Sequence, residues 1–126
     1  MSNQEPIANY KFNYKTTANK VMKNINLSGK TIIITGGYSG IGLEMTKQLS
    51  HAGAKIIVPA RRMEVAKKNL SKIKKIDILP LDLTNPESIH QFAESFLQNN
   101  SKLDILINSA GLMYLPLKRN SQGIEY

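Results

Sequence analysis

The chain has 126 residues, enough for one small domain, and its 41% hydrophobic and 21% charged residues are typical of a globular protein. It contains no cysteine, which excludes disulfides, thiolate catalysis and cysteine-ligated metal clusters. The net charge of +8 is uneven, because residues 1–75 carry 14 Lys and Arg against 3 Asp and Glu (+11) and residues 76–126 carry 3 against 6 (−3).

The sequence predicts no targeting, membrane or metal-binding segment. Residues 1–15 lack the apolar run of a signal peptide, and the longest apolar runs elsewhere are short and strand-like. His51 and His90 lie far apart without an acidic partner at ligand spacing, so both are expected on helix surfaces. We therefore expect a cytoplasmic protein without a membrane partner or a bound metal.

The first element lies in a polar extension, residues 1–27, and is expected to be a short helix over residues 17–25 with apolar contacts from Val21, Met22 and Ile25. The domain itself is expected to occupy residues 28–126. It begins with residues 30–35 (KTIIIT), whose β-branched apolar run between glycines predicts a strand buried on both faces.

A helix is predicted after the glycine-rich turn that follows this strand. It ends at Gly53, and its apolar stripe is Ile41, Met45, Leu49 and Ala52. Residues 55–59 (KIIVP) predict a second strand. The basic stretch 61–75 then has apolar residues at helical spacing, which leaves its lysines on the solvated side and favours an ordinary solvated face over nucleic-acid binding. Those apolar residues are Met63, Ala66, Leu70 and Ile73.

Residues 76–81 (IDILPL) predict the third strand, and residues 103–108 (LDILIN) predict the fourth. Between them lies a helix with two alternative starts. Either Asn85 caps it with Pro86 at the first position, or Thr84 and Glu87 form a capping box. The apolar stripe of this helix consists of Ile89, Phe92, Ala93 and Phe96.

The resulting order, β-α-β-α-β-α-β, predicts an α/β fold with a parallel sheet in the strand order 3-2-1-4, the first half of a Rossmann sheet. The fourth strand is then an exposed apolar edge rather than a central strand. Such an edge invites self-association or pairing with a chain that carries the other half of the sheet.

Residues 35–42 (TGGYSGIG) follow a predicted strand and open a helix, which is the setting of a nucleotide-binding turn. Gly36 and Gly40 allow backbone angles closed to other residues and leave room for a phosphate. The free N–H groups of the helix N-terminus then face the pyrophosphate, and Gly42 lets the helix approach the strand closely. Tyr38 is interpreted as a turn residue beside the phosphates.

The ends of the other strands meet this turn in a doubly wound sheet. They carry residues 60–62 (ARR), 81–83 (LDL) and 108–111 (NSAG), where Asp82 either accepts from an adenine amino group or caps the next turn. The candidate cofactor-binding residues are Gly36, Tyr38, Ser39, Gly40, Ile41, Gly42, Arg61, Arg62, Asp82, Leu83, Asn108, Ala110 and Gly111.

The residues after the second strand predict the cofactor. An NAD site places Asp or Glu about 20 residues beyond the glycine turn to hold the ribose 2′-hydroxyl. Here Arg61 and Arg62 occupy that place, and the first carboxylate after the second strand is Glu64. A guanidinium pairs instead with a 2′-phosphate, so NADP(H) is predicted, with Arg61 as the main contact and NAD(H) as the alternative.

These motifs resemble the short-chain dehydrogenase/reductase family over about residues 16–126. TGGYSGIG resembles its TGxxxGIG motif, LDLT its aspartate segment, and DILINSAG its DxLxNNAG segment with Ser109 for the second Asn. The branch with retinol dehydrogenases and the WW-domain oxidoreductase is most similar, because it shares Thr-Thr-Ala at 16–18, Leu-x-Gly-Lys at 27–30, Arg61 and Gly-x-Glu at 123–125. The resemblance implies an oxidoreductase of alcohols or carbonyls.

The same resemblance implies that the catalytic segments lie elsewhere. The family's catalytic Asn, Ser and Tyr-x-x-x-Lys follow further along its pattern, so we assign no catalytic residue and expect this chain alone to be inactive. Residues 114–118 (YLPLK) match the Tyr-x-x-x-Lys spacing, but Pro116 disfavours a helix there. The alternatives are a non-catalytic nucleotide-binding module or half of a split protein, and a basic nucleic-acid-binding protein.

Overall fold

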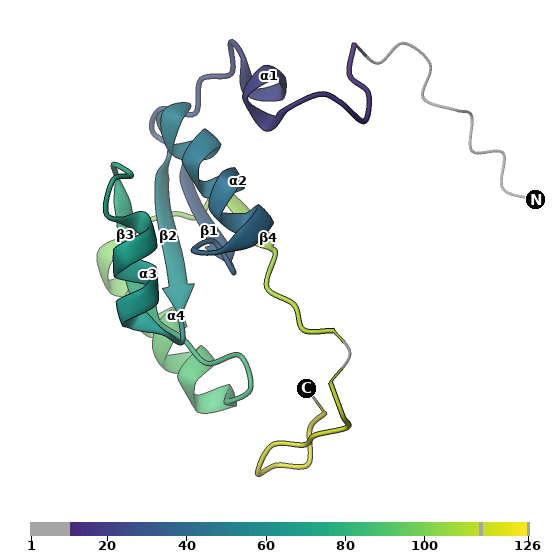
Figure 1. The fold of residues 1–126 in the computed structure, drawn as a ribbon. Helices are drawn as coiled ribbons and strands as arrows, with labels where there is room; N and C mark the ends of the chain where they lie inside the picture. The colour runs from purple at the N-terminus through teal and green to yellow at the C-terminus, as the bar shows by residue number, and fades with distance from the viewer. Residues whose placement is uncertain (1–10, 114, 126) are drawn as a thin grey trace, which may run out of the picture.

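The computed structural model describes residues 11–113 and 115–125, in which four parallel strands form one sheet with the order β3-β2-β1-β4 (Figure 1). This architecture confirms the predicted fold class and strand order. The elements in chain order are α1 (Ala18–Met22), β1 (Thr31–Thr35), α2 (Gly40–His51), β2 (Lys55–Ala60), α3 (Met63–Leu70), β3 (Ile76–Pro80), α4 (Pro86–Asn99) and β4 (Ile105–Asn108).

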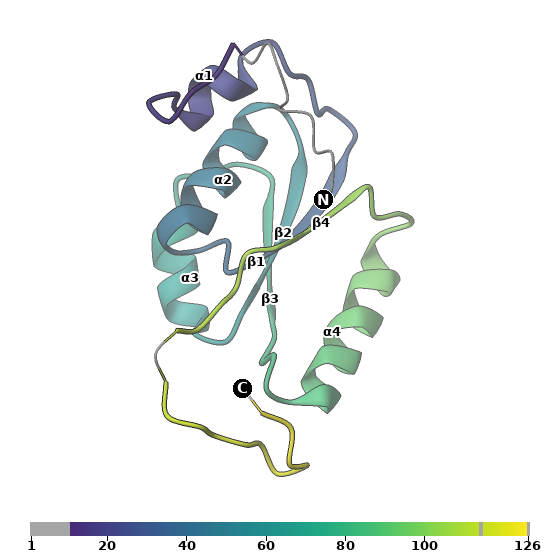
Figure 2. The ribbon, with the colours of Figure 1, turned by 90° about the vertical axis from the view of Figure 1, so that its right-hand side faces the viewer.

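The main core lies between one face of the sheet and helices α2 and α3, which Figure 2 shows together on that side. Strand β1 is buried along its whole length, as its β-branched run predicts, and Ile32 and Ile34 are fully buried. The predicted stripe of α3 packs here as well, and Ile73 joins it although the helix ends at Leu70. The lysines of the 61–75 stretch remain exposed.

Among the described residues, α4 is the only helix on the opposite face of the sheet (Figure 2). Its buried anchor is Phe96, which packs with Ile33 and Ile57, while Phe92 contacts the same cluster. The predicted stripe is wrong at Ile89 and Ala93, both of which are exposed. Helix α4 contacts the sheet chiefly at β3, so only part of its apolar face reaches the strands.

Helix α2 turns a different face to the sheet than its apolar spacing predicts. Ile41 is 81% exposed, so the predicted stripe is wrong at that position. The buried positions are Gly42 and Thr46, while Met45 and Leu49 pack against the core from their flanks. Because the residues on the inner face of α2 are a glycine and a threonine, the hydrophobic spacing of the sequence predicted a buried stripe one position away from the observed one.

Helix α1 is shorter than the predicted 17–25 segment. The Thr17 side chain caps its N-terminus by accepting from the Lys20 N–H. The helix ends at Met22, and Asn24 has a left-handed φ of +69° that an α-helix does not continue through. Met22 is half-buried, whereas Val21 and Ile25 are 39% and 43% exposed, so none of the three predicted apolar residues is buried in the core.

The N-terminus of α4 shows which of the two predicted caps forms. The Asn85 side chain accepts from the Glu87 N–H at 3.0 Å, and Pro86 occupies the first helical turn. Thr84 makes no capping box, because its hydroxyl donates to the Asp82 carboxylate instead. Asn85 therefore caps the helix, as the first of the two predictions has it.

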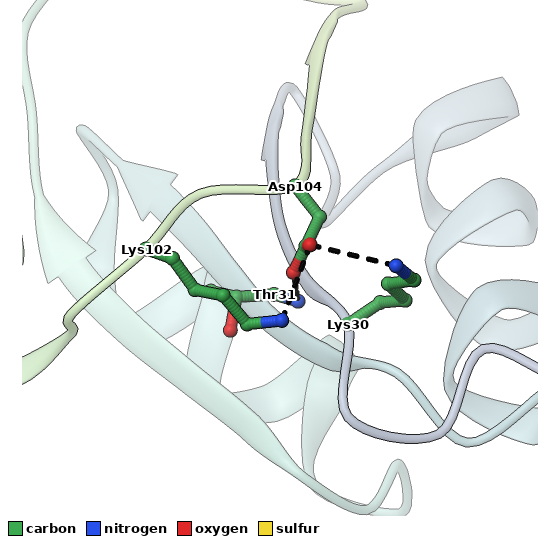
Figure 3. Close-up of polar contacts among 4 residues, drawn as sticks. All are labelled: Lys30, Thr31, Lys102 and Asp104. Carbon is green, nitrogen blue, oxygen red and sulfur yellow. Dashed lines mark hydrogen bonds and ion pairs between the residues drawn. The ribbon is translucent and has the colours of Figure 1, made fainter.

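Strand β4 begins at Ile105, two residues later than predicted, and Asp104 anchors its start to β1. One Asp104 carboxylate oxygen accepts from the Thr31 N–H at 2.8 Å, and Lys30 and Lys102 approach the other at 3.7 and 3.3 Å (Figure 3). The Thr31 hydrogen bond, followed by the two lysines, lowers the pKa of Asp104 below its usual 3.8. The Asp104 side chain thus links the start of β4 to β1, as a further backbone hydrogen bond would do if β4 were longer.

Strand β4 forms one end of the sheet and pairs only with β1 among the described residues. Ile105 is 37% exposed and Leu106 is 54% exposed, which confirms the exposed apolar edge that the sequence predicts. In the described ranges, no helix has the length and apolar character needed to cross a membrane.

Candidate functional site

A cavity of about 680 Å³ opens at the carboxyl ends of the four strands. It brings together eleven of the thirteen predicted cofactor-binding residues. Gly40 and Asn108 do not line it. Six further residues line it that were not among the thirteen candidates. Thr35, Leu81 and Ser109 lie within the predicted motif segments, and Pro59, Thr84 and Leu112 directly flank them.

The glycine turn lies at the end of β1 and leads into the N-terminus of α2. Gly36 has a φ of +68°, and a Cβ there would stand 2.9 Å from the Ala110 Cα, so a larger residue fits neither the backbone nor the space. A Cβ on Gly42 would overlap the carbonyl oxygen of Gly36. These two glycines allow α2, the turn and the loop after β4 to meet without side chains between them.

The first turn of α2 presents its N–H groups without a side-chain cap. Ser39 occupies the N-cap position in an extended conformation, and its hydroxyl makes no capping hydrogen bond. Gly40 has a φ of +52°, which turns the chain into the helix. Free N–H groups and the positive end of the helix dipole together favour an anion at this point.

Thr35 joins the two loops that flank the cavity. Its hydroxyl oxygen accepts from the N–H groups of Ser109 and Ala110, both at 3.1 Å, and so ties the end of β1 to the turn after β4. This role of Thr35 was not predicted from the sequence, because the contact joins residues more than 70 positions apart. The threonine that precedes the glycine turn was the available signal.

Asp82 caps the turn after β3, as one of its two predicted roles requires. Its Oδ1 atom accepts from the Thr84 N–H at 2.9 Å and from the Thr84 hydroxyl at 2.7 Å. The Asp82 N–H donates to the Ser88 hydroxyl at 2.9 Å, which links the turn to α4. The two Thr84 hydrogen bonds, with a smaller contribution from the Arg61 charge, lower the pKa of Asp82 below 3.8.

Arg61 and Arg62 lie between β2 and α3, with Arg62 at the N-cap of the helix. Both are exposed and line the cavity. Neither guanidinium forms an ion pair with a described residue. Two cations at the rim of a cavity lined by a phosphate-type glycine turn suit a ligand with a second anionic group.

The two histidines lie away from this site, and the Tyr-x-x-x-Lys spacing at residues 114–118 lies partly outside the described residues. His51 ends α2 and His90 lies on α4, both on the surface as predicted. The prediction that His90 has no acidic partner is wrong, because its Nε2 atom lies 3.3 Å from the Glu94 carboxylate one helical turn away. No group of three potential metal ligands occurs among the described residues. Tyr114, the tyrosine of the Tyr-x-x-x-Lys spacing, lies outside the described residues, and residues 115–118 form no helix.

Comparison with known proteins agrees with this geometry. The model of the family described as short chain dehydrogenase matches residues 30–123. The chain belongs to the short-chain dehydrogenase family. Within the solved structures, this short-chain dehydrogenase chain is similar to that of Pseudomonas aeruginosa RhlG, determined as an NADP active-site complex, with a TM-score of 0.64 and 31% identity over 70% of this chain and 37% of that one.

Three named relatives extend the comparison. The chain is 40% identical over 87% of its length to the chloroplastic short-chain dehydrogenase TIC 32 B of Brassica napus. It is 35% identical over 81% of its length to human retinol dehydrogenase 12 and 31% identical over 96% to the human WW domain-containing oxidoreductase, which confirms the predicted branch. The chain spans about a third of the length of these relatives, 36%, 34% and 31% respectively.

Proposed function

We propose that these 126 residues form the NADP(H)-binding portion of a short-chain dehydrogenase that acts on an alcohol or carbonyl substrate. The observation that carries this proposal is the meeting of the glycine turn, the Arg61–Arg62 pair and the Asp82 turn around one cavity. Its volume of about 680 Å³ falls within the range of ligand sites, roughly 300–1,000 Å³.

The glycine turn suits the pyrophosphate. Gly36 and Gly42 add no side chain where the glycine turn meets the start of α2, and the first turn of α2 has no side-chain cap, so its N–H groups suit an anion. Arg61 and Arg62 suit the 2′-phosphate, since both are exposed at the rim and without an ion-pair partner among the described residues. The nicotinamide of a bound cofactor supplies the hydride chemistry.

The remaining predicted contacts complete the adenosine side of the proposed site. Asp82 uses Oδ1 for the Thr84 turn, and we propose that its other carboxylate oxygen accepts from the adenine amino group. Leu83 is 52% exposed in the cavity wall and offers an apolar surface to the base. Ala110 has only a methyl side chain and Gly111 has none, so a ribose has room to lie against the backbone of the loop after β4.

Replacing Arg61 by alanine tests the cofactor choice. A charge-assisted hydrogen bond contributes about 1.5–3 kcal/mol, so R61A is expected to weaken NADPH binding by roughly ten- to a hundredfold. NADH binding changes little, because NADH has no 2′-phosphate. The measurement is a fluorescence titration of the purified chain with each cofactor, with sizing in parallel because we also propose that the exposed β4 edge makes the chain self-associate.

K68A is the matched control, because it removes the same charge from α3 at an exposed position that does not line the cavity. If R61A and K68A weaken NADPH binding equally, the preference comes from overall charge and not from a 2′-phosphate contact. Equal affinity of the wild-type chain for NADPH and NADH also contradicts the proposal.

A further inference from the structure

The carbonyl groups of the glycine turn are held by side chains from two different helices. The Gly37 carbonyl accepts from the Thr46 hydroxyl of α2 at 2.8 Å, and the Tyr38 carbonyl accepts from the Asn69 side-chain amide of α3 at 2.9 Å. Thr46 is fully buried, whereas Asn69 is exposed. Neither Thr46 nor Asn69 lines the cavity, so both carbonyls are directed toward groups outside it.

This arrangement matters for an anion. A turn that binds a phosphate needs its N–H groups toward the ligand and its carbonyl oxygens away from it, because a carbonyl dipole facing the site repels negative charge. Without a donor, the Tyr38 peptide is free to rotate and to turn its carbonyl toward the cavity. A donor outside the cavity removes that freedom before any ligand arrives.

We propose that Asn69 is a positioning residue of the phosphate-binding turn. Its amide fixes the Tyr38 carbonyl away from the cavity and ties α3, which begins beside Arg61 and Arg62, to the turn at the start of α2. The buried Thr46 hydroxyl does the same for the Gly37 carbonyl. This inference rests on the proposed function, since it assigns the turn a phosphate to bind.

Two variants of Asn69 test the hydrogen bond without touching the cavity. N69A removes the side chain, and N69L keeps its approximate shape but has no donor. A neutral hydrogen bond is worth about two- to tenfold in a dissociation constant, so both variants are expected to weaken NADP⁺ and NAD⁺ binding by that factor, equally for the two cofactors. Binding of 2′-AMP, which lacks the pyrophosphate, is expected to stay unchanged.

N99A is the matched control, because the Asn99 amide likewise donates to a backbone carbonyl, that of Ser95, on an exposed face of α4 far along the chain from the turn. It is expected to leave all three dissociation constants unchanged. Unchanged NADP⁺ affinity in N69A and N69L overturns the proposal. A parallel loss of 2′-AMP affinity also overturns it, because that result indicates general loosening of the site.

Amide hydrogen exchange in the ligand-free chain separates this inference from the proposed function. Loss of the Asn69 hydrogen bond is expected to speed exchange at residues 38–42 in N69A and N69L but not in N99A. A wild-type chain that binds no dinucleotide overturns the proposed function, and the exchange rates then decide alone whether Asn69 fixes the turn. Equal rates in wild type and N69A overturn that role.

Discussion

Replacing Gly42 by alanine tests whether the approach of α2 to β1 is limited by space. The added Cβ would overlap the Gly36 carbonyl oxygen, a backbone atom that has no rotamer to change. On its other side the turn packs closely on the loop after β4, since a Cβ added to Gly36 would stand only 2.9 Å from the Ala110 Cα. Relief therefore requires α2 to move away from the sheet.

The expected size of this effect follows from two opposing contributions. Alanine gains about 1 kcal/mol over glycine within a helix, whereas overpacking at a tightly packed position costs about 1–3 kcal/mol. Since the obstacle is backbone on both sides, the upper end of that range applies, and G42A is expected to lower the free energy of unfolding by about 2 kcal/mol. Urea unfolding followed by circular dichroism measures this change.

Gly111 provides the matched control within the same cavity wall. A Cβ there meets no atom within 4 Å, and its φ is not in the left-handed region. G111A is expected to change the free energy of unfolding by less than about 0.5 kcal/mol. A G42A variant as stable as G111A refutes the steric argument, and NADP⁺ binding that survives G42A refutes its consequence for the proposed site.

Two further predictions concern the scaffold of the site. F96A removes the buried anchor of α4 and is expected to lower the free energy of unfolding, measured with urea, by about 3–5 kcal/mol. L97A, at a neighbouring position that is 71% exposed, is expected to lower it by less than about 0.5 kcal/mol. Equal losses in the two variants contradict the packing of α4. D104N keeps an acceptor for the Thr31 N–H and removes the charge. Because the pKa of Asp104 is lowered by folding, its charge stabilises the fold above pH 3.8 and this contribution is lost as the pH falls through the lowered pKa. D104N is therefore expected to be less stable than wild type at pH 7, with the difference closing below about pH 4; a difference that is constant with pH contradicts this role.

The sequence predicted the fold well because the strands are short β-branched runs and the stripe of α3 is strongly apolar. It failed where the inner face of an element carries small or polar residues. Gly42 and Thr46 face the sheet from α2, although Ile41 appears the better core residue by composition. It also failed on α4, where Ile89 and Ala93 have the spacing of core residues but are exposed.

The candidate site was predictable to the extent that it is local in sequence. Glycines, arginines and an aspartate at strand ends identified eleven lining residues, because parallel strands bring their carboxyl ends to one edge. The contacts that fix these loops join residues distant in sequence, such as Thr35 with Ser109 and Asn69 with Tyr38. Threonine and asparagine side chains form many kinds of hydrogen bond with nearby backbone groups, so their presence in a sequence does not reveal a distant partner.

These fixed and free groups divide the proposed site into two parts with different tasks. The loops around the proposed pyrophosphate region are held before a ligand binds by Thr35 and Asn69, and the Asp82 turn holds the proposed adenosine side in the same way, so binding orders little additional backbone. Arg61 and Arg62 are exposed and have no ion-pair partner among the described residues, so a bound anion would have to fix two long side chains at an entropic cost. The proposed function therefore predicts that affinity common to NADP(H) and NAD(H) arises from the preformed turn, and that a preference between them depends on two screened surface charges and weakens as the salt concentration rises.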